Sequence, residues 1–169
     1  METIIVKMVQ NKLTKQLETF THNQDIKNAI NYISGKGSNF KHEIVIFYNA
    51  LGLNKDNVTA GNDIIKMQKK KGKSNDKRRG YHMIISFPEE ITDTDLVIYI
   101  AKLITKKIYN NGYQVYYGIH SSTDNLHIHI FINAISYYIN GKKFHFNNQY
   151  TYDLSHWLTE EVIERITCY

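Results

Sequence analysis

Histidine and isoleucine alternate in the string HIHI at residues 127–130, inside the longer segment LHIHIFIN. Successive side chains of a β-strand point to opposite faces of a sheet, so this alternation predicts a strand with two different faces. Its isoleucines would enter a hydrophobic core, while His127 and His129 would project together from the other face. The strand therefore requires a sheet that is apolar on one side and carries imidazoles on the other.

A third histidine precedes this strand. His120 ends the apolar stretch VYYGI, and the polar run SSTDN that follows has the composition of a turn. A hairpin at this turn would bring His120 beside His127 and His129. Three neutral imidazoles from two adjacent strands form a metal site with open positions, which is typical of catalytic metals. A half-buried strand with outward-facing polar residues is the alternative, but the third histidine and Asp124 in the turn favour the metal site.

The rest of the chain alternates between strand and helix patterns. A helix is expected to begin near Asp25, a possible N-cap, and to carry Tyr32. The Asn-Gly pair at 140–141 predicts a hairpin followed by a strand through Phe146. The segment 40–53 fits a strand or a helix equally well. The other expected elements are strands over 3–9, 81–87, 113–120 and 126–136 and helices over 92–110 and about 154–166.

These elements are connected by hairpins rather than by repeated β-α-β units. That pattern indicates an α+β fold, with an antiparallel sheet of about five strands and helices packed on one of its faces. The chain of 169 residues is long enough for one compact domain, so residues 1–169 are expected to form a single domain.

The segment 61–80 is strongly basic. It is predicted to form a flexible loop, which is either simply solvated or an arm that follows a phosphate backbone by releasing counterions. The net charge of +5 is compatible with a polyanionic partner. The candidate DNA-binding residues are Lys69, Lys70, Lys71, Lys73, Lys77, Arg78 and Arg79.

The composition excludes several classes of protein. Cys168 is the only cysteine, which excludes an internal disulfide framework and a cysteine-based zinc site. No run approaches the roughly 20 apolar residues that cross a bilayer, and the N-terminal stretch lacks the long apolar region of a signal peptide. We therefore expect a cytoplasmic protein without membrane insertion, whose metal site is built from histidines.

A histidine-bound metal beside a basic surface indicates phosphodiester chemistry, because the ion can polarise a non-bridging oxygen. The nucleophile is open at this point. A water molecule would make the protein a hydrolytic nuclease, and a side-chain hydroxyl would make it a covalent strand-transfer enzyme. With 13 tyrosines in the chain, composition does not select one.

Three segments of the chain occur in the same order as the motifs of a known protein family. NAINYI around Tyr32, then YHMIISF, then HSSTDNLHIHIFIN resemble the relaxases of conjugative and mobilisable elements, in the HUH endonuclease superfamily, and are most similar to the P-type (MobA/VirD2-like) mobilisation relaxases. The resemblance implies nicking and rejoining of single-stranded transfer-origin DNA, with a hairpin next to the nick. It also implies a 5′-phosphotyrosine intermediate, an accessory relaxosome protein and the coupling protein of a type IV secretion system.

The resemblance assigns roles by position. Tyr32 would be the nucleophile, and Asp124 would orient a ligand imidazole from outside the metal's coordination shell. Mg²⁺ or Mn²⁺ would be the working ion, although other transition metals could occupy imidazole ligands. The metal ligands would be His120, His127 and His129. The residues in supporting roles would be Asn133, His82 and Ser86.

Other functions remain compatible with these residues. Some related relaxases use an N-terminal histidine, for which His22 is the candidate. In replication initiators and single-tyrosine transposases the nucleophile follows the histidines, which would select Tyr150 or Tyr152. A non-catalytic module that binds single-stranded DNA would stack bases on the sheet, and a structural metal would be needed for folding. The candidate stacking residues are Tyr116, Phe131 and Tyr137.

Overall fold

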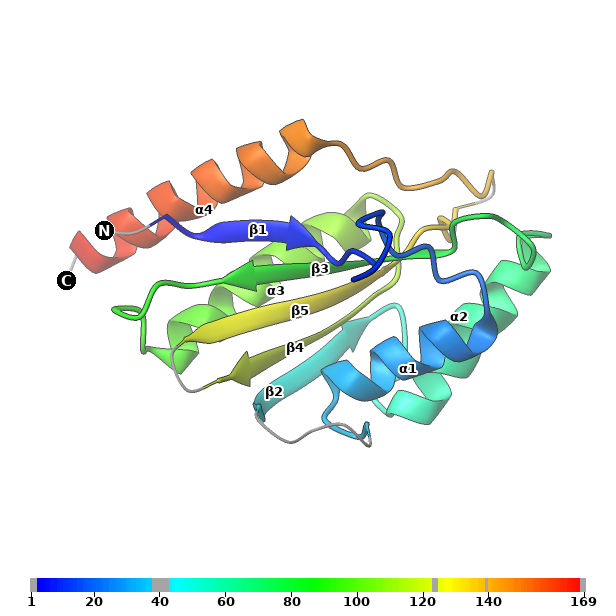
Figure 1. The fold of residues 1–169 in the computed structure, drawn as a ribbon, viewed down its shortest axis with the longest axis horizontal. Helices are drawn as coiled ribbons and strands as arrows, with labels where there is room; N and C mark the ends of the chain where they lie inside the picture. The colour runs from blue at the N-terminus through cyan, green and yellow to red at the C-terminus, as the bar shows by residue number, and fades with distance from the viewer. Residues whose placement is uncertain (1–2, 38–42, 123–124, 139, 168–169) are drawn as a thin grey trace.

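The computed structural model describes residues 3–37, 43–122, 125–138 and 140–167 (Figure 1). Five strands form one antiparallel sheet in the order β1-β3-β5-β4-β2, which confirms the α+β class. The strands are β1 (Ile5–Met8), β2 (Ile44–Leu51), β3 (Gly80–Ser86), β4 (Val115–Ser121) and β5 (Leu126–Asn133). The helices are α1 (Asn23–Ile33), α2 (Asn57–Lys70), α3 (Thr94–Asn110) and α4 (Asn148–Thr167).

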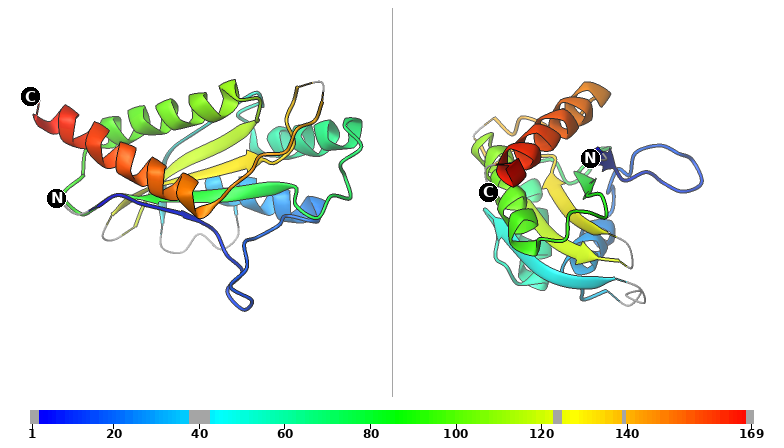
Figure 2. Two further views of the ribbon diagram at one scale, coloured as in Figure 1. Left: turned by 90° about the horizontal axis from the view of Figure 1, so that it is seen from above. Right: turned by 90° about the vertical axis from the view of Figure 1, so that its left-hand side faces the viewer.

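The helices cover both faces of the sheet, so the expectation that they pack on one face is wrong. Helices α3 and α1 lie on opposite sides of the strands (Figure 2). Side chains of α3 and α4 enter one hydrophobic cluster, and side chains of α1 and α2 enter another. Both clusters share the central strands β4 and β5 because alternate residues of each strand point to opposite faces.

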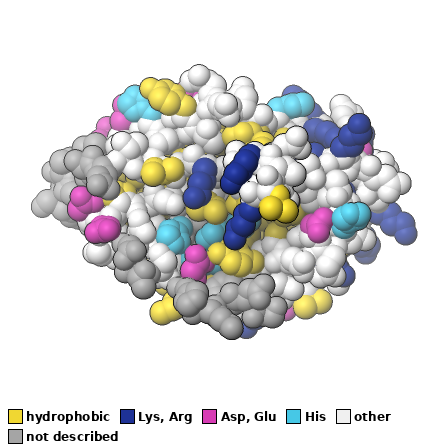
Figure 3. All heavy atoms as spheres, in the orientation of Figure 1, with side chains coloured by type: hydrophobic (Ala, Val, Ile, Leu, Met, Phe, Trp, Pro, Cys, Tyr) yellow, Lys and Arg dark blue, Asp and Glu magenta, His cyan; other side chains and the backbone are white. Residues whose placement is uncertain are grey.

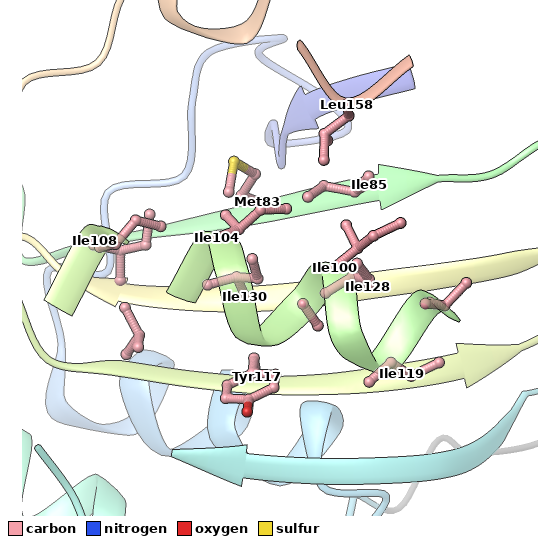
Figure 4. Close-up of a cluster of buried hydrophobic side chains, with 14 of the residues drawn as sticks. Met83, Ile85, Ile100, Ile104, Ile108, Tyr117, Ile119, Ile128, Ile130 and Leu158 are labelled. Atoms are coloured by element: carbon pink, nitrogen blue, oxygen red, sulfur yellow. The ribbon is translucent and has the colours of Figure 1, made fainter. Parts of the chain in front are cut away.

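The larger cluster lies between the sheet and α3 (Figure 4). Ile128 and Ile130 are fully buried in it, as the alternation in HIHI predicts. They meet Ile100 and Ile104 of α3, which recur at helical spacing. Burying an isoleucine side chain contributes roughly 1.5–3 kcal/mol, so this face supplies much of the stability of the sheet.

The second cluster attaches α1 to the histidine-bearing face. Ile26, Ile30 and Ile33 are fully buried on one side of α1, against Tyr116 and Phe131 of the sheet. The helix begins one turn earlier than Asp25: its N-cap is His22, and the Asp25 carboxylate accepts a hydrogen bond from the His22 backbone N–H at 3.0 Å. The carboxylate thus satisfies an otherwise unpaired N–H at the helix start.

Gly118 lets the end of α1 approach β4 closely. A Cβ atom at this position would lie 2.5 Å from the backbone oxygen of Ile33, the last residue of α1. Real Cβ atoms do not come so near a backbone oxygen, so any other residue would push the helix end away from the sheet. The position of Tyr32, in the same last turn, therefore depends on this glycine.

The first half of the predicted basic loop at 61–80 is a helix, because α2 runs through Lys70, and residues 71–79 connect it to β3, which begins at Gly80. Asp56 caps α2 by accepting the Thr59 N–H at 2.8 Å. Ala60 and Ile64 are buried at helical spacing, and the basic side chains gather at the C-terminal end, where the helix dipole favours cations.

The remaining differences concern the segment 40–53, the strand expected through Phe146 and the start of the last helix. The undecided segment 40–53 contains β2, a strand. The strand expected through Phe146 does not form: only an isolated bridge joins Ile135 to Lys143. Phe144 instead packs its ring edge-on against Tyr81 and Tyr113, and this core contact takes the chain away from the sheet edge. Helix α4 begins at Asn148, six residues before the expected start at Leu154.

Gly118→Ala is expected to lower the free energy of unfolding by about 1–3 kcal/mol, because the new methyl group overlaps the Ile33 carbonyl oxygen. Urea unfolding measures the change. Gly37→Ala is the matched control, since its nearest neighbour would lie at an ordinary 3.7 Å, and it should change stability by less than about 0.5 kcal/mol. Equal effects of the two substitutions would contradict the argument.

Candidate active site

Tyr32 lies over the histidines of the sheet. Its ring centroid is 5.2 Å from that of His129, 5.4 Å from that of His120 and 6.2 Å from that of His82. The last turn of α1 supplies the tyrosine, and β4, β5 and β3 supply the three histidines. Residues that are far apart in the sequence thus form one polar cluster, with Tyr32 at its centre.

Glu43 joins this cluster directly before β2, and no local sequence pattern points to it. The Tyr32 hydroxyl donates a hydrogen bond to its Oε2 atom at 2.7 Å, and His120 Nδ1 lies 2.9 Å from the same oxygen. The contact arises from strand pairing, because Val45 of β2 is opposite His120 of β4. Only the register of the folded sheet brings the carboxylate to the histidines.

Three side chains are arranged to hold a metal ion. Ligand atoms of Glu43, His120 and His129 all lie within 4.8 Å of one another. His129 Nε2 is buried and has no hydrogen-bond partner among the described residues, which is costly for a polar atom unless something binds it. Imidazole nitrogens with a carboxylate oxygen suit divalent transition metals such as Mn²⁺. The residues present therefore fit a metal ion.

This group differs from the predicted trio of imidazoles in one member. His127 lies on the same face, opposite His120 in the register, with its ring centroid 6.1 Å from that of His129. It is half-buried and does not belong to the close group of ligand atoms. Alternation along β5 fixes the face from which His127 projects, but not its side-chain rotamer.

His82, which was predicted to support the site, lies beside His129 on the neighbouring strand β3. Its Nε2 atom lies 3.1 Å from His129 Nδ1. Burial and the nearby His120 lower the pKa of His82 to about 4, so this ring is neutral at pH 7. If His129 offers Nε2 to a metal, its Nδ1–H donates to His82 and the ring is held in that tautomer. Ser86, also predicted to support the site, lies opposite His127 but makes no side-chain hydrogen bond within the described part of the chain.

The protonation states of Tyr32 and Glu43 are complementary. Burial raises the pKa of the Tyr32 phenol, and the hydrogen bond to Glu43 and the negative charge of Glu43 raise it further. Burial alone would raise the pKa of Glu43, but hydrogen bonds from Tyr32 and His120 outweigh it and lower the pKa. At neutral pH the phenol therefore keeps its proton beside an ionised carboxylate that can accept it.

Two predicted residues lie in a different place, in a buried polar network. Asn133 accepts a hydrogen bond from Gln68 at 2.8 Å and donates one to Gln114 at 2.9 Å. Arg79 is 2% exposed, and its guanidinium donates to Gln68, to the Thr21 carbonyl and to Asn23. The predicted contact of Arg79 with DNA is wrong for this structure, because the side chain is enclosed by protein oxygens.

The basic segment lies at the other end of α1 from Tyr32. The end of α2 lies beside the start of α1 (Figure 1), where Arg79 contacts Thr21 and Asn23. His22 caps the same end, about 15 Å along the helix from Tyr32 at 1.5 Å per residue. His22 is therefore outside the cluster of histidines, and Asp124 lies outside the described residues.

The other candidate aromatic residues do not meet their expected roles. Tyr116 and Phe131 are fully buried beneath α1, so stacking of bases on them is excluded in this conformation. Tyr137 is half-buried, and its hydroxyl donates to the Tyr109 carbonyl. Tyr150 packs against Phe144 in the α3-side cluster, and Tyr152 is exposed on α4. None of these is part of the Tyr32 cluster.

Comparison with protein families identifies the chain. The family model described as "Relaxase: MobA/VirD2-like, nuclease domain" matches residues 32–165, well over half of the sequence. The protein belongs to this family of DNA-nicking relaxases, whose dependence on a metal ion agrees with the group formed by Glu43, His120 and His129. Comparisons with curated proteins and with solved structures gave no match. Among the described residues, no helix is long and apolar enough to cross a membrane.

Mn²⁺ is expected to bind one site per chain, and His129→Ala should abolish binding because it removes the unpaired Nε2. His82→Ala should weaken binding by about 10–100-fold through loss of ring orientation. Isothermal titration calorimetry measures both, with His156→Ala, an exposed histidine of α4, as the control. If His127→Ala abolished binding while Glu43→Gln left it unchanged, the three imidazoles rather than the Glu43 group would hold the ion.

Proposed function

We propose that this relaxase nicks and rejoins single-stranded transfer-origin DNA through a covalent bond to Tyr32, and so initiates conjugative transfer or mobilisation. The supporting observation is the 2.7 Å hydrogen bond between the Tyr32 hydroxyl and Glu43, next to His120 and His129. A nucleophile, a base and metal ligands within one cluster are the parts that transfer of a phosphodiester bond needs.

The reaction follows from the protonation states. The Tyr32 oxygen attacks a backbone phosphorus while Glu43 takes the phenolic proton. The bond between phosphorus and the 3′ oxygen breaks, and that oxygen becomes a 3′-hydroxyl by taking up a proton from water. The product is a 5′-phosphotyrosine and a free 3′ end. Rejoining is the reverse transesterification and needs no ATP, because the phosphotyrosine keeps the energy of the broken bond.

Glu43, His120 and His129 would hold the metal ion, and His127 is a candidate further ligand from the same face. A bound Mg²⁺ or Mn²⁺ would polarise a non-bridging phosphate oxygen and offset the negative charge of the transition state. The role of His82 is to orient His129. Burial keeps these rings neutral, because it lowers the pKa values of His82, His127 and His129.

The family also suggests the biological setting. We infer that the substrate carries a hairpin beside the nick, and that the enzyme acts in the cytoplasm with an accessory relaxosome protein and a secretion-system coupling protein. We further infer that residues 1–169 act as one nuclease domain, because both hydrophobic clusters are built on the same sheet.

Tyr32→Phe is expected to abolish covalent attachment to DNA. The purified protein is incubated with Mn²⁺ and a labelled pool of randomised single-stranded oligonucleotides, and adducts are read on a denaturing gel. Tyr152→Phe is the control, because this exposed tyrosine of α4 should leave the adduct unchanged. An adduct that persists in Tyr32→Phe and disappears in His22→Ala would show that His22, rather than Tyr32, is the nucleophile.

Glu43→Gln is expected to slow adduct formation by about 10²–10⁴-fold at saturating Mn²⁺, because the phenol loses its base. The wild-type rate should be level with pH above the lowered pKa of Glu43 and fall as pH drops through it. The rate of the variant should instead rise with pH, since the phenol, whose pKa is raised, must then lose its proton to solvent. Identical pH profiles would remove Glu43 from the role of base.

A further inference from the structure

A part of the histidine-bearing face is left uncovered by α1 and α2. It consists of side chains on β1, β3 and β5 that we call the open strip, defined by Ile5, Lys7, Ile84, Ser86 and His127. Ile5 is 58% exposed, Lys7 is exposed, and the other three are partly exposed. The side chains that α1 covers are instead those of Tyr116 and Phe131, further along β4 and β5.

Strand register places the open strip beside His129, one of the three candidate metal ligands Glu43, His120 and His129. Lys7 is opposite Ile84, and Ile84 is opposite His129, so the three side chains form a row on one face. Two strand spacings of about 4.8 Å separate the first and last backbones of this row. A lysine side chain and one phosphate group together span such a distance, so a strand of DNA held at His129 passes within reach of Lys7.

Lys7 places an exposed ammonium group on the open strip. Among the residues that the structure describes, its ammonium group has no hydrogen bond or ion pair. On the face that carries the site, Lys or Arg side chains lie beside His side chains near the centre (Figure 3).

The chemistry of the open strip suits a nucleic-acid strand. An ammonium group pairs with a backbone phosphate, while Ile5 and Ile84 offer apolar contact to a sugar or base. Lys7 of β1 contributes a positive charge to this strip. The nearby Glu43 carboxylate is already hydrogen-bonded to Tyr32 and His120. The basic end of α2 cannot serve the same nucleotide, since it lies at the opposite end of α1.

We propose that the open strip carries the DNA strand past the active site, and that Lys7 binds the backbone phosphate next to the one attacked by Tyr32. This inference rests on the proposed nicking function. It separates two contacts with DNA: Lys7 positions the reacting segment, and the basic end of α2 is free to bind a more distant part of the substrate.

The first test is the salt dependence of binding to fluorescein-labelled (dT)20, measured by fluorescence anisotropy in EDTA so that no metal chemistry intervenes. Lys7→Ala should weaken binding and reduce the slope of log K against log salt by about 0.7, the value of one contact with a single strand. Lys7→Arg should restore both. Lys106→Ala is the control, because this exposed lysine lies on α3, behind the sheet. Equal slopes in the Lys7→Ala and Lys106→Ala variants would overturn the proposal.

The second test locates the strand. Photocrosslinking with (dT)20 that contains 4-thiothymidine, followed by peptide mass spectrometry, should label peptides of β1 and β3 in the wild type and in Tyr32→Phe. Crosslinks confined to residues 69–78, or an absence of (dT)20 binding, would overturn the proposal.

The two proposals fail separately. Labelled β1 and β3 peptides without any Mn²⁺-dependent adduct would support the DNA path and contradict the nicking function. A Tyr32 adduct with crosslinks only on α2 would do the reverse.

Discussion

The contact between the last turn of α1 and strand β4 determines the site. Gly118 leaves room for the Ile33 carbonyl, and that carbonyl also lies 2.9 Å from His120 Nε2. The same contact therefore fixes both the helix that carries Tyr32 and one of the histidines beneath it. Ile26, Ile30 and Ile33 stabilise the arrangement by burial against the sheet. Without this close approach, the position of Tyr32 relative to Glu43, His120 and His129 would not be fixed.

Burial gives the cluster its electrostatic character. Desolvation favours the neutral form of a histidine and of a tyrosine, so the rings of His82 and His129 stay neutral and the Tyr32 phenol stays protonated. Glu43 is the exception, because hydrogen bonds from Tyr32 and His120 stabilise its charge. The site thus combines the neutral ring of His129, whose Nε2 has no partner among the described residues, with one ionised carboxylate that can receive a proton.

The two faces of the sheet serve different purposes. The face toward α3 is filled with aliphatic side chains and holds the strands in register. The other face has three regions. One lies beneath α1, the second is a buried network that links Arg79 to the start of α1, and the third consists of the uncovered residues near β1. The buried network anchors the start of α1, and the contact at Gly118 positions its end, so the helix that carries the tyrosine is fixed at both ends.

Several features followed from the sequence alone. The alternation in HIHI gave the two-faced strand, helical spacing gave α1 and α3, and the order of three segments indicated the family and selected Tyr32 as the candidate nucleophile. These signals are local, because periodicity reports which side of one element is buried. The tertiary structure decided the rest: Glu43 reaches His120 through pairing of β2 with β4, His127 lies outside the close group, and Arg79 is enclosed. Register between distant strands and the burial of single side chains depend on how all elements pack together, and no short segment of sequence contains that information.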